Sequence, residues 1–533
     1  MVTAPNSEVE TLKESQVWLQ PKETLSAPAA IELGQLLDCL VPRLLSYVDA
    51  TASSKLPVAA DTSPSELTKL LDLEFEDVGL SQEGLVELLA PIVMKSVRSW
   101  DPRFCDKLYA STNAIGVVAE LVLAVLNANS HVYHVSPSLT LAETATARSL
   151  AKMFGMGINS GGITLPGGSA SNTTAMTTAR NLRFPHIKES GYGADDRLSV
   201  FTSTHSHYSI EKAAIVLGIG SSRVYKVPCS LDGRMLPTAL KAAIETSISK
   251  GEKPFFVNCT AGTTVLGSFD DIEAVAAITR PLGLWLHVDG SWGGPVIFSP
   301  TYRHLVFSSS LADSLTINPH KLLGVPVQCS FLLLQDKRLL FKANSLQADY
   351  LFHDQADQFR DLGNATMGCG RRPDAFKMYL AWKYYGAAHF SQRVTAACDN
   401  ALYLAERIAQ SPYLQLAFPV HSVNVCFWFR SQDSIAFSSI ADSHLWTQDF
   451  AIPPSWGRLT QAIQKKLSSK GEFMIDFAPA TIHVPSPNGQ LKEVVLPPFF
   501  RMVMNSPNLT TSHLDALVNS IESIGKELSV ADA

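Results

Sequence analysis

Two short segments of this chain contain the residues best suited to covalent chemistry. Asp289 closes an apolar run, Leu284 to Val288, that is typical of a buried strand, and Lys321 follows an Asn-Pro-His turn farther along the chain. Burial at a strand end lowers the pKa of a Lys amine and makes it a usable nucleophile, and a buried carboxylate requires a cationic partner. Pyridoxal phosphate (PLP) chemistry needs such a pair: the amine forms a Schiff base, and the carboxylate keeps the pyridine nitrogen protonated. A surface Lys and an ordinary salt bridge would give the same patterns, so neither segment is sufficient alone.

Two further segments would complete such a site. The loop Pro166-Gly-Gly-Ser-Ala-Ser-Asn172 precedes a helical run, and the amides of a helix N-terminus bind phosphate together with Ser hydroxyls. His207 lies between a strand-like and a helix-like run, where its ring can stack on a flat group. A Gly-Gly-Ser loop is often only a turn, and such a His is often a capping residue. The order of loop, His207, Asp289 and Lys321, each at the end of an element, favours one PLP site over four unrelated features.

The pattern of the middle of the chain predicts the elements that position these residues. Between Ser111 and Arg338, continuous apolar runs alternate with helix-like runs, which indicates an α/β domain whose mainly parallel sheet is buried on both faces. Ligands of such sheets bind at the carboxyl ends of the strands, where Thr260, Asp289 and Lys321 fall. The expected strands are Leu198–Ser203, Phe255–Cys259, Leu284–Asp289, Ser314–Asn318 and Cys329–Leu334.

Composition and charge narrow the class of function. The 533 residues are 46% hydrophobic and 17% charged, which is ordinary for a globular protein of more than one domain. A formal charge of −6 gives no electrostatic reason to expect nucleic acid or an anionic membrane as a partner. The longest helix-like apolar stretch, Ala114 to Leu126, is too short to span a bilayer. The eight cysteines lack a metal-binding pattern and the acidic N-terminus lacks a secretory signal, so we expect no metal and a cytoplasmic location.

Four segments are expected along the chain. Residues 1–30 are predicted to form a flexible arm, and residues 31–110 a helical segment with too few apolar residues for a core of its own. Such a segment is expected to pack on the rest of the chain or on a second subunit. Residues 111–385 are predicted to form the large cofactor-binding domain, and residues 386–533 a smaller α+β domain that ends in a helix.

Eight segments of the chain carry a family pattern. They are Asp101-Pro-Arg-Phe, Pro166-Gly-Gly-Ser-Ala-Ser-Asn, Ser206-His-Tyr-Ser-Ile-Glu-Lys-Ala, Thr260-Ala-Gly-Thr-Thr-Val-Leu-Gly-Ser-Phe-Asp, His287-Val-Asp-Gly-Ser-Trp-Gly-Gly, Asn318-Pro-His-Lys, Cys369-Gly-Arg-Arg-Pro-Asp-Ala-Phe-Lys and Pro498-Phe-Phe-Arg-Met-Val. Together they resemble the group II PLP-dependent amino acid decarboxylases of fold type I, in particular the branch with glutamate and cysteine-sulfinate decarboxylases. The resemblance implies a large domain with a mainly parallel seven-stranded sheet, PLP as cofactor, and a homodimer whose subunits share the active sites.

The resemblance also implies roles for individual residues. Lys321 corresponds to the Schiff-base Lys, Asp289 to the partner of the pyridine nitrogen and His207 to the ring-stacking His. The residues implied to hold the phosphate are Ser169, Ala170, Ser171, Asn318 and His320, and those implied to flank the ring are Thr260 and Ser291. Arg501 corresponds to the Arg that binds the substrate α-carboxylate. Lys107 falls where the branch usually has a Gln that contacts the distal acidic group.

Three positions depart from that branch. The family's mobile loop carries a Tyr thought to return a proton to the carbanion, whereas residues 353–368 here contain no Tyr, and Phe359 or Arg360 falls nearest. Gly290-Ser291 stands where the branch usually has Ala-Ala. His131 stands where the branch has an aromatic residue in a segment of the substrate pocket.

A pocket with Lys107 and His131 is more cationic and shorter in reach than a glutamate site. We therefore expect α-decarboxylation of a small acidic amino acid (aspartate, cysteine sulfinate or glutamate), giving the amine and carbon dioxide. Two enzymatic alternatives stay open: a relative that diverts the carbanion to an aldehyde or a new carbon–carbon bond, and an aromatic amino acid decarboxylase. A family member kept only for binding or regulation is disfavoured by the intact Lys321, Asp289 and His207.

Overall fold

The chain forms two compact units in the computed structural model. The structure describes residues 25–346, 360–430, 437–442, 445–446, 450–485 and 490–531. One unit comprises residues up to 56 together with 62–96, and the other comprises 57–61 together with everything from 97 onward. Most of the predicted arm, residues 1–24, lies outside the described residues. The division into two compact units does not follow the boundaries of the four predicted domain ranges. Those ranges therefore stay predictions.

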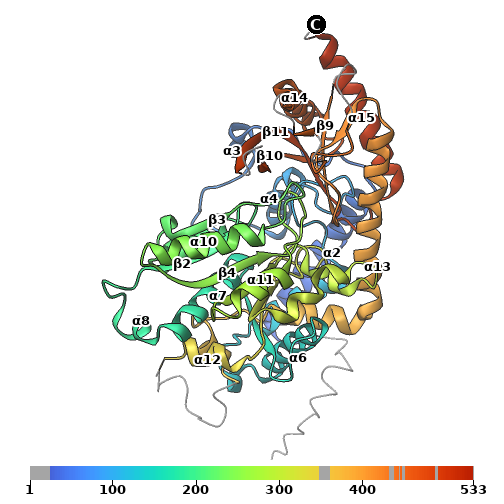
Figure 1. Cartoon of the computed structure of the whole chain (residues 1–533). Helices are drawn as coiled ribbons and strands as arrows, with labels where there is room; N and C mark the ends of the chain where they lie inside the picture. Colours follow the sequence, from blue (N-terminus) through green and yellow to red (C-terminus); the bar gives the residue numbers. More distant parts are fainter. Residues whose placement is uncertain are drawn as a thin grey trace, which may run out of the picture. The chain divides into compact units, whose positions relative to one another are not determined.

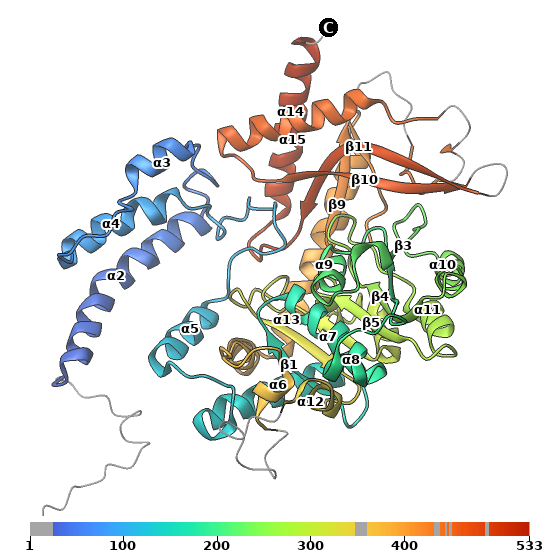
Figure 2. The same cartoon turned by 90° about the vertical axis from the view of Figure 1, so that its left-hand side faces the viewer.

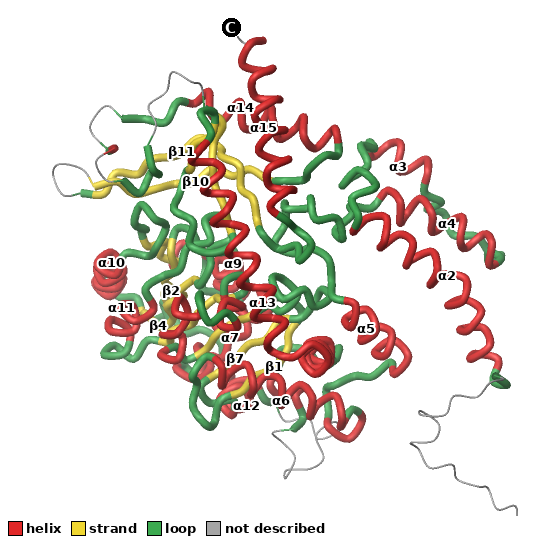
Figure 3. Tube along the Cα trace, turned by 90° about the vertical axis from the view of Figure 1, so that its right-hand side faces the viewer, coloured by secondary structure: helices red, strands yellow, loops and turns green. Residues whose placement is uncertain are grey.

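The first unit consists of three helices. They are α2 (Pro28–Ala52), α3 (Pro64–Leu70) and α4 (Gln82–Lys95). Ser81 caps the N-terminus of α4, because its hydroxyl accepts a hydrogen bond from the Gly84 amide at 3.2 Å. α2 and α4 lie side by side (Figures 2 and 3) and enclose an apolar cavity of about 490 Å³. No residue of α3 or α4 is buried, which agrees with the expectation that this segment lacks a core of its own.

The second unit is built on a seven-stranded sheet. Its strands, in spatial order, are β1 (Gly161–Leu165), β7 (Ser330–Leu334), β6 (Ser314–Ile317), β5 (Trp285–Gly290), β4 (Lys253–Thr260), β2 (Leu198–Ser203) and β3 (Val224–Val227). Only β7 pairs antiparallel with its neighbours. The predicted mainly parallel seven-stranded sheet is confirmed, and so are its five predicted strands.

Helices cover both faces of this sheet (Figure 1). Alternate residues of a strand point to opposite faces, and accordingly Phe256 packs in one apolar core with α7 and α9 while Val257 packs in another with α10 and α11. This double burial explains why the strands are continuously apolar. The helices of this part are α5 (Ala114–Leu126), α6 (Pro137–Met153), α7 (Gly168–Arg183), α8 (Pro185–Ser190), α9 (Ser209–Val216), α10 (Pro237–Ser249), α11 (Ile272–Thr279), α12 (Arg338–Asn344) and α13 (Ala375–Gln410).

A smaller antiparallel sheet follows α13, a long helix that Gly386, with a φ of 74°, interrupts. Its strands, in spatial order, are β10 (Asp476–Pro485), β11 (Leu491–Val503), β9 (Asn424–Phe429) and β8 (Leu414–Leu416). Two helices, α14 (Pro454–Lys470) and α15 (Thr511–Ala531), accompany it (Figure 3). The expected C-terminal α+β segment with its final helix is therefore present. None of the described helices has both the length and the apolar content needed to cross a membrane.

Candidate active site

A cavity of about 230 Å³ lies at the carboxyl ends of the parallel strands. Parallel strands bring their carboxyl ends to one edge of the sheet, so β2, β4, β5 and β6 place residues distant in sequence around this cavity. Eight predicted residues line it: Ser169, His207, Thr260, Asp289, Ser291, Asn318, His320 and Lys321. Two predicted phosphate residues do not: Ala170 lines a neighbouring cavity, and the hydroxyl of Ser171 is 2.7 Å from that of Ser330 instead.

Lys321 and Asp289 are both buried in this cavity and influence each other's charge. Burial lowers the pKa of the Lys321 amine, and the Asp289 carboxylate opposes that effect only in part. Burial alone would raise the pKa of Asp289, but the hydrogen bond from Ser291 and the charge of Lys321 hold it below its ordinary value. The Asp289 Oδ1 accepts the Ser291 amide at 3.1 Å, and its Oδ2 accepts the Asn172 Nδ2 at 2.9 Å. The site thus combines an amine inclined to lose its proton with a carboxylate that stays charged.

His207 presents a neutral imidazole to the cavity. Its Nδ1 accepts a hydrogen bond from the Ser209 amide at 3.2 Å, so the ring proton lies on Nε2. Burial lowers the pKa of His207, while the charge of Asp289 partly opposes that shift. The ring is therefore able to stack on a flat ligand and to donate a hydrogen bond from Nε2.

The cavity contains buried polar atoms that lack partners. Among the described residues, Thr260 Oγ1, Ser291 Oγ and Asn318 Oδ1 make no hydrogen bond although all three are buried. Such atoms are rare in folded proteins unless a ligand or water satisfies them. Gly168, at the start of α7, keeps the cavity open, because a Cβ there would lie 2.7 Å from the Ser291 Oγ. These features fit a polar cofactor with a phosphate at the first turn of α7.

Arg501 and Lys107 belong to an ionic cluster beside the cavity. The Arg501 Nη2 lies 2.8 Å from the Asp476 Oδ2, which is also 3.2 Å from the Lys107 Nζ. The Lys107 Nζ is 3.0 Å from the Asp106 Oδ1. The Arg501 Nη1 donates to the carbonyl of Thr264, a residue that lines the cavity, at 3.5 Å. The cluster therefore adjoins the cavity through Thr264, although neither cation lines it.

His131 is not brought to the cavity within this chain. Its Nδ1 lies 3.3 Å from the Asn129 carbonyl, and its own carbonyl accepts the Gly363 amide at 2.8 Å. The first part of the predicted loop, residues 353–359 with Phe359 included, lies outside the described residues, whereas residues 360–368 are described. The guanidinium of Arg360 lies 5.2 Å from the centre of the Tyr133 ring.

Four contributing residues were missed by reasoning from sequence. Asn172 and His287 support Asp289, while Asp106 and Asp476 hold the two cations. A signal for His287 was available, because it lies two positions before Asp289 on a strand and so points to the same face. Asp476 gave no such signal, because only the register of β10 with β11 sets it opposite Arg501.

Comparison with known proteins agrees with this geometry. A family model described as the pyridoxal-dependent decarboxylase conserved domain matches residues 64–430. The L-aspartate decarboxylase dtxS4 of Metarhizium robertsii is 42% identical over 457 residues, 85% of each chain. Human cysteine sulfinic acid decarboxylase is 36% identical over 470 residues, 87% of this chain and 90% of the relative. The crystal structure of mouse CSAD superposes with a TM-score of 0.82 at 33% identity, covering 94% of this chain and 99% of that one.

Proposed function

The chain belongs to the pyridoxal-dependent decarboxylase family, and on that premise we propose that it decarboxylates a small acidic amino acid at its α-carbon, giving the amine and carbon dioxide. The observation that carries the proposal is the buried pair of Lys321 and Asp289 in a cavity whose polar atoms lack partners. Aspartate and cysteine sulfinate are the favoured substrates, because the relatives named above act on them. Glutamate has one more methylene and is ranked below them.

The lining residues would hold PLP by complementary groups. Ser169 and the first amides of α7 would bind the phosphate, with Asn318 and His320 beside it. When bound, PLP supplies an electron sink for the electron pair left by the departing carboxylate. Asp289 keeps a negative charge where the pyridine nitrogen would lie, and Lys321 supplies an amine that is able to accept and return a proton.

At the substrate end, we propose that Arg501 binds the α-carboxylate and Lys107 the distal acidic group. Asp476 accepts hydrogen bonds from both cations and so fixes their positions. The Arg501 Nε is buried and has no hydrogen-bond partner among the described residues, which leaves a donor for a carboxylate. The two cations, Lys107 and Arg501, lie beside two carboxylates, those of Asp106 and Asp476. The positive and negative charges of the cluster are therefore equal in number before an anionic substrate binds. The predicted role of His131 stays a prediction, because His131 is not among the residues that line the cavity.

We also propose that the protein is a cytoplasmic homodimer. The helices of the first unit expose large apolar side chains, including Leu44 at 50% and Leu45 at 63% exposure, and such surfaces mark association sites. All eight cysteines are free thiols, which supports a reducing compartment. Light scattering on the purified protein tests the dimer: a mass near twice 57.9 kDa is expected, and a monomer at micromolar concentration contradicts it.

Product identification tests the proposed reaction. PLP-loaded protein is incubated with aspartate, cysteine sulfinate, glutamate and aromatic amino acids, and the products are identified by mass. The corresponding amine is expected from an acidic substrate, without peroxide or ammonia. An aldehyde accompanied by peroxide and ammonia would support the carbanion-diverting alternative, and faster turnover of an aromatic substrate would contradict the acidic-substrate proposal.

A further inference from the structure

Asn172, which lines the cavity, connects Asp289 to the interior of the sheet. Its Nδ2 is 2.9 Å from the Asp289 Oδ2 and 2.9 Å from the Ser209 Oγ. Its Oδ1 is 3.0 Å from the His287 Nε2. Both amide hydrogens and the carbonyl oxygen of Asn172 are thus engaged. All four residues are buried, so these hydrogen bonds do not compete with bulk solvent.

The chain of hydrogen bonds continues from His287 to the outer end of the strands. The His287 Nδ1 is 2.8 Å from the Ser314 Oγ, and the Trp285 Nε1 donates to the same oxygen at 2.8 Å. Trp285, His287 and Asp289 alternate on β5 and so share one face. Ser314 lies directly opposite His287 in the pairing of β5 with β6. We call Trp285, Ser314, His287 and Asn172 the relay.

Every hydrogen bond in the relay has one allowed direction. A carboxylate only accepts and an indole N–H only donates, so Asn172 must turn its amide hydrogens to Asp289 and its oxygen to His287. The His287 proton therefore lies on Nε2, and the Nδ1 accepts the hydroxyl hydrogen of Ser314. Ser314 in turn accepts from Trp285. The Thr316 Oγ1, which is 3.4 Å from the His287 Nε2, is a second acceptor for the same ring proton.

We propose that the relay is a positioning network that orients the Asp289 carboxylate and preserves its charge for a cation in the cavity. This inference rests on the proposed function, in which that cation is the pyridine ring nitrogen of PLP. Every donor in the relay is neutral, so the carboxylate receives hydrogen bonds without being paired to a competing charge. Burial lowers the pKa of His287 to about 4, which keeps its ring neutral at physiological pH.

The position of the His287 proton makes the proposal testable with a matched pair of variants. Gln places an amide nitrogen near the position of the imidazole Nε2 and can still donate to Asn172, whereas Asn is one methylene too short. Apoprotein is titrated with PLP, and the dissociation constant is read from tryptophan fluorescence quenching. His287→Gln is expected to bind PLP within about threefold of wild type, and His287→Asn about tenfold more weakly or worse.

Ser314→Ala provides a second variant that creates little space. It frees the His287 Nδ1 and is expected to weaken PLP binding about fivefold. Ser199→Ala is its control, because Ser199 is a fully buried strand residue whose hydroxyl lies 2.7 Å from that of Ser247, away from the relay. Ser199→Ala is expected to lower the melting temperature comparably while leaving the PLP dissociation constant unchanged.

The outcomes separate this inference from the proposed function. If wild-type apoprotein does not bind PLP, the proposed function fails and the relay's role fails with it. If wild type binds PLP and Asp289→Asn weakens that binding, but His287→Asn and Ser314→Ala bind like wild type, the proposed function stands and the relay is overturned. Equal loss of affinity in Ser199→Ala and Ser314→Ala would likewise overturn it, since the effect would then be one of stability.

Discussion

At the scale of single residues, the site depends on charges that burial would otherwise remove. Lys321 and Asp289 are each desolvated, and each partly offsets the effect of burial on the other. Arg501 shows the same principle at the substrate end, where Asp476 holds its guanidinium in place at 2.8 Å. A paired cation keeps its charge and its orientation, and both are needed to bind a carboxylate.

Replacing Arg501 by Lys tests whether the fork of its guanidinium matters. The charge is retained but the planar donor pair is lost, so kcat/KM for an acidic substrate is expected to fall about tenfold to a hundredfold, mainly through KM. Steady-state kinetics on the PLP-loaded enzyme provide the measurement. Arg407→Lys is the control, because Arg407 makes a comparable 2.7 Å ion pair with Asp515 on the α13–α15 surface. Unchanged KM in Arg501→Lys would remove Arg501 from substrate binding.

Sequence reasoning recovered the residues that stand at strand ends and missed those that act through them. Lys321 and Asp289 follow recognisable apolar runs, so their place at the sheet edge was predictable. Asn172 was visible only as part of a glycine-containing loop, and its amide acquires a role from the position of α7 against β5. The ion pair between Asp476 and Lys107 joins distant parts of the chain, and no local sequence pattern predicts such a contact.

At the scale of elements, the start of α7 controls how closely a phosphate can approach. Gly167 has a φ of 96°, a conformation that favours glycine, and Gly168 begins the helix beside Ser291 and Asn318. β1 leads directly into this turn. The helix N-terminus and the strand ends thus meet around the same cavity.

Gly168→Ala is expected to weaken PLP binding about tenfold or more, since its Cβ would lie 2.7 Å from the Ser291 Oγ and 2.8 Å from the Asn318 Nδ2. The PLP dissociation constant of the apoprotein is the measured quantity. Gly79→Ala serves as the control, because a Cβ at Gly79 meets nothing within 4 Å. Wild-type affinity in Gly168→Ala would mean that the phosphate does not bind at this turn.

The five strands predicted from continuous apolar runs are present, but other strands escaped prediction. β1 begins with two glycines and β3 has only four residues, so neither has a clear apolar period. Prolines at 479, 485, 497 and 498 interrupt the patterns of β10 and β11. The pairing of β10 with β11 depends on tertiary packing. It includes a register shift between Ala478 and Ala480 that no local propensity specifies.

At the scale of the whole molecule, histidines shielded from solvent make stability depend on pH. Burial lowers the pKa of His205, His287 and His320 to about 4, from an ordinary value of 6.5. Between these values the unfolded chain binds more protons than the folded one, so stability rises with pH in that window and is lost on acidification. Each histidine contributes up to about 1.4 kcal/mol per pH unit.

Denaturant unfolding of the apoprotein at pH 7, 6 and 5 measures this dependence. The free energy of unfolding is expected to decrease as the pH falls, and the loss should be smaller in His287→Gln, which removes one of these groups. His304→Gln is the control, because it makes the same replacement at an exposed position. Stability that is constant or increases between pH 7 and pH 5 would contradict the assignment of neutral histidines at these positions.

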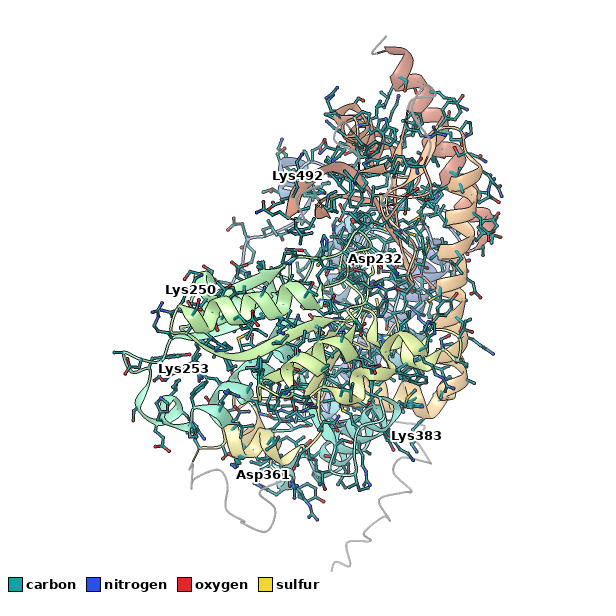
Figure 4. All side chains as sticks on the ribbon, viewed as in Figure 1. Asp232, Lys250, Lys253, Asp361, Lys383 and Lys492 are labelled. Atoms are coloured by element: carbon teal, nitrogen blue, oxygen red, sulfur yellow. The ribbon has the colours of Figure 1, made fainter. Side chains whose placement is uncertain are left out.

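Carbon dioxide release from amino acids labelled at carbon 1 tests the central claim most directly. With saturating PLP, wild type is expected to release label from aspartate or cysteine sulfinate at least about tenfold faster than from tryptophan. Lys321→Ala should release none, while Lys250→Ala, which changes a Lys on the outer surface (Figure 4), should match wild type. Faster release from tryptophan, or label released by Lys321→Ala at the wild-type rate, would contradict the account.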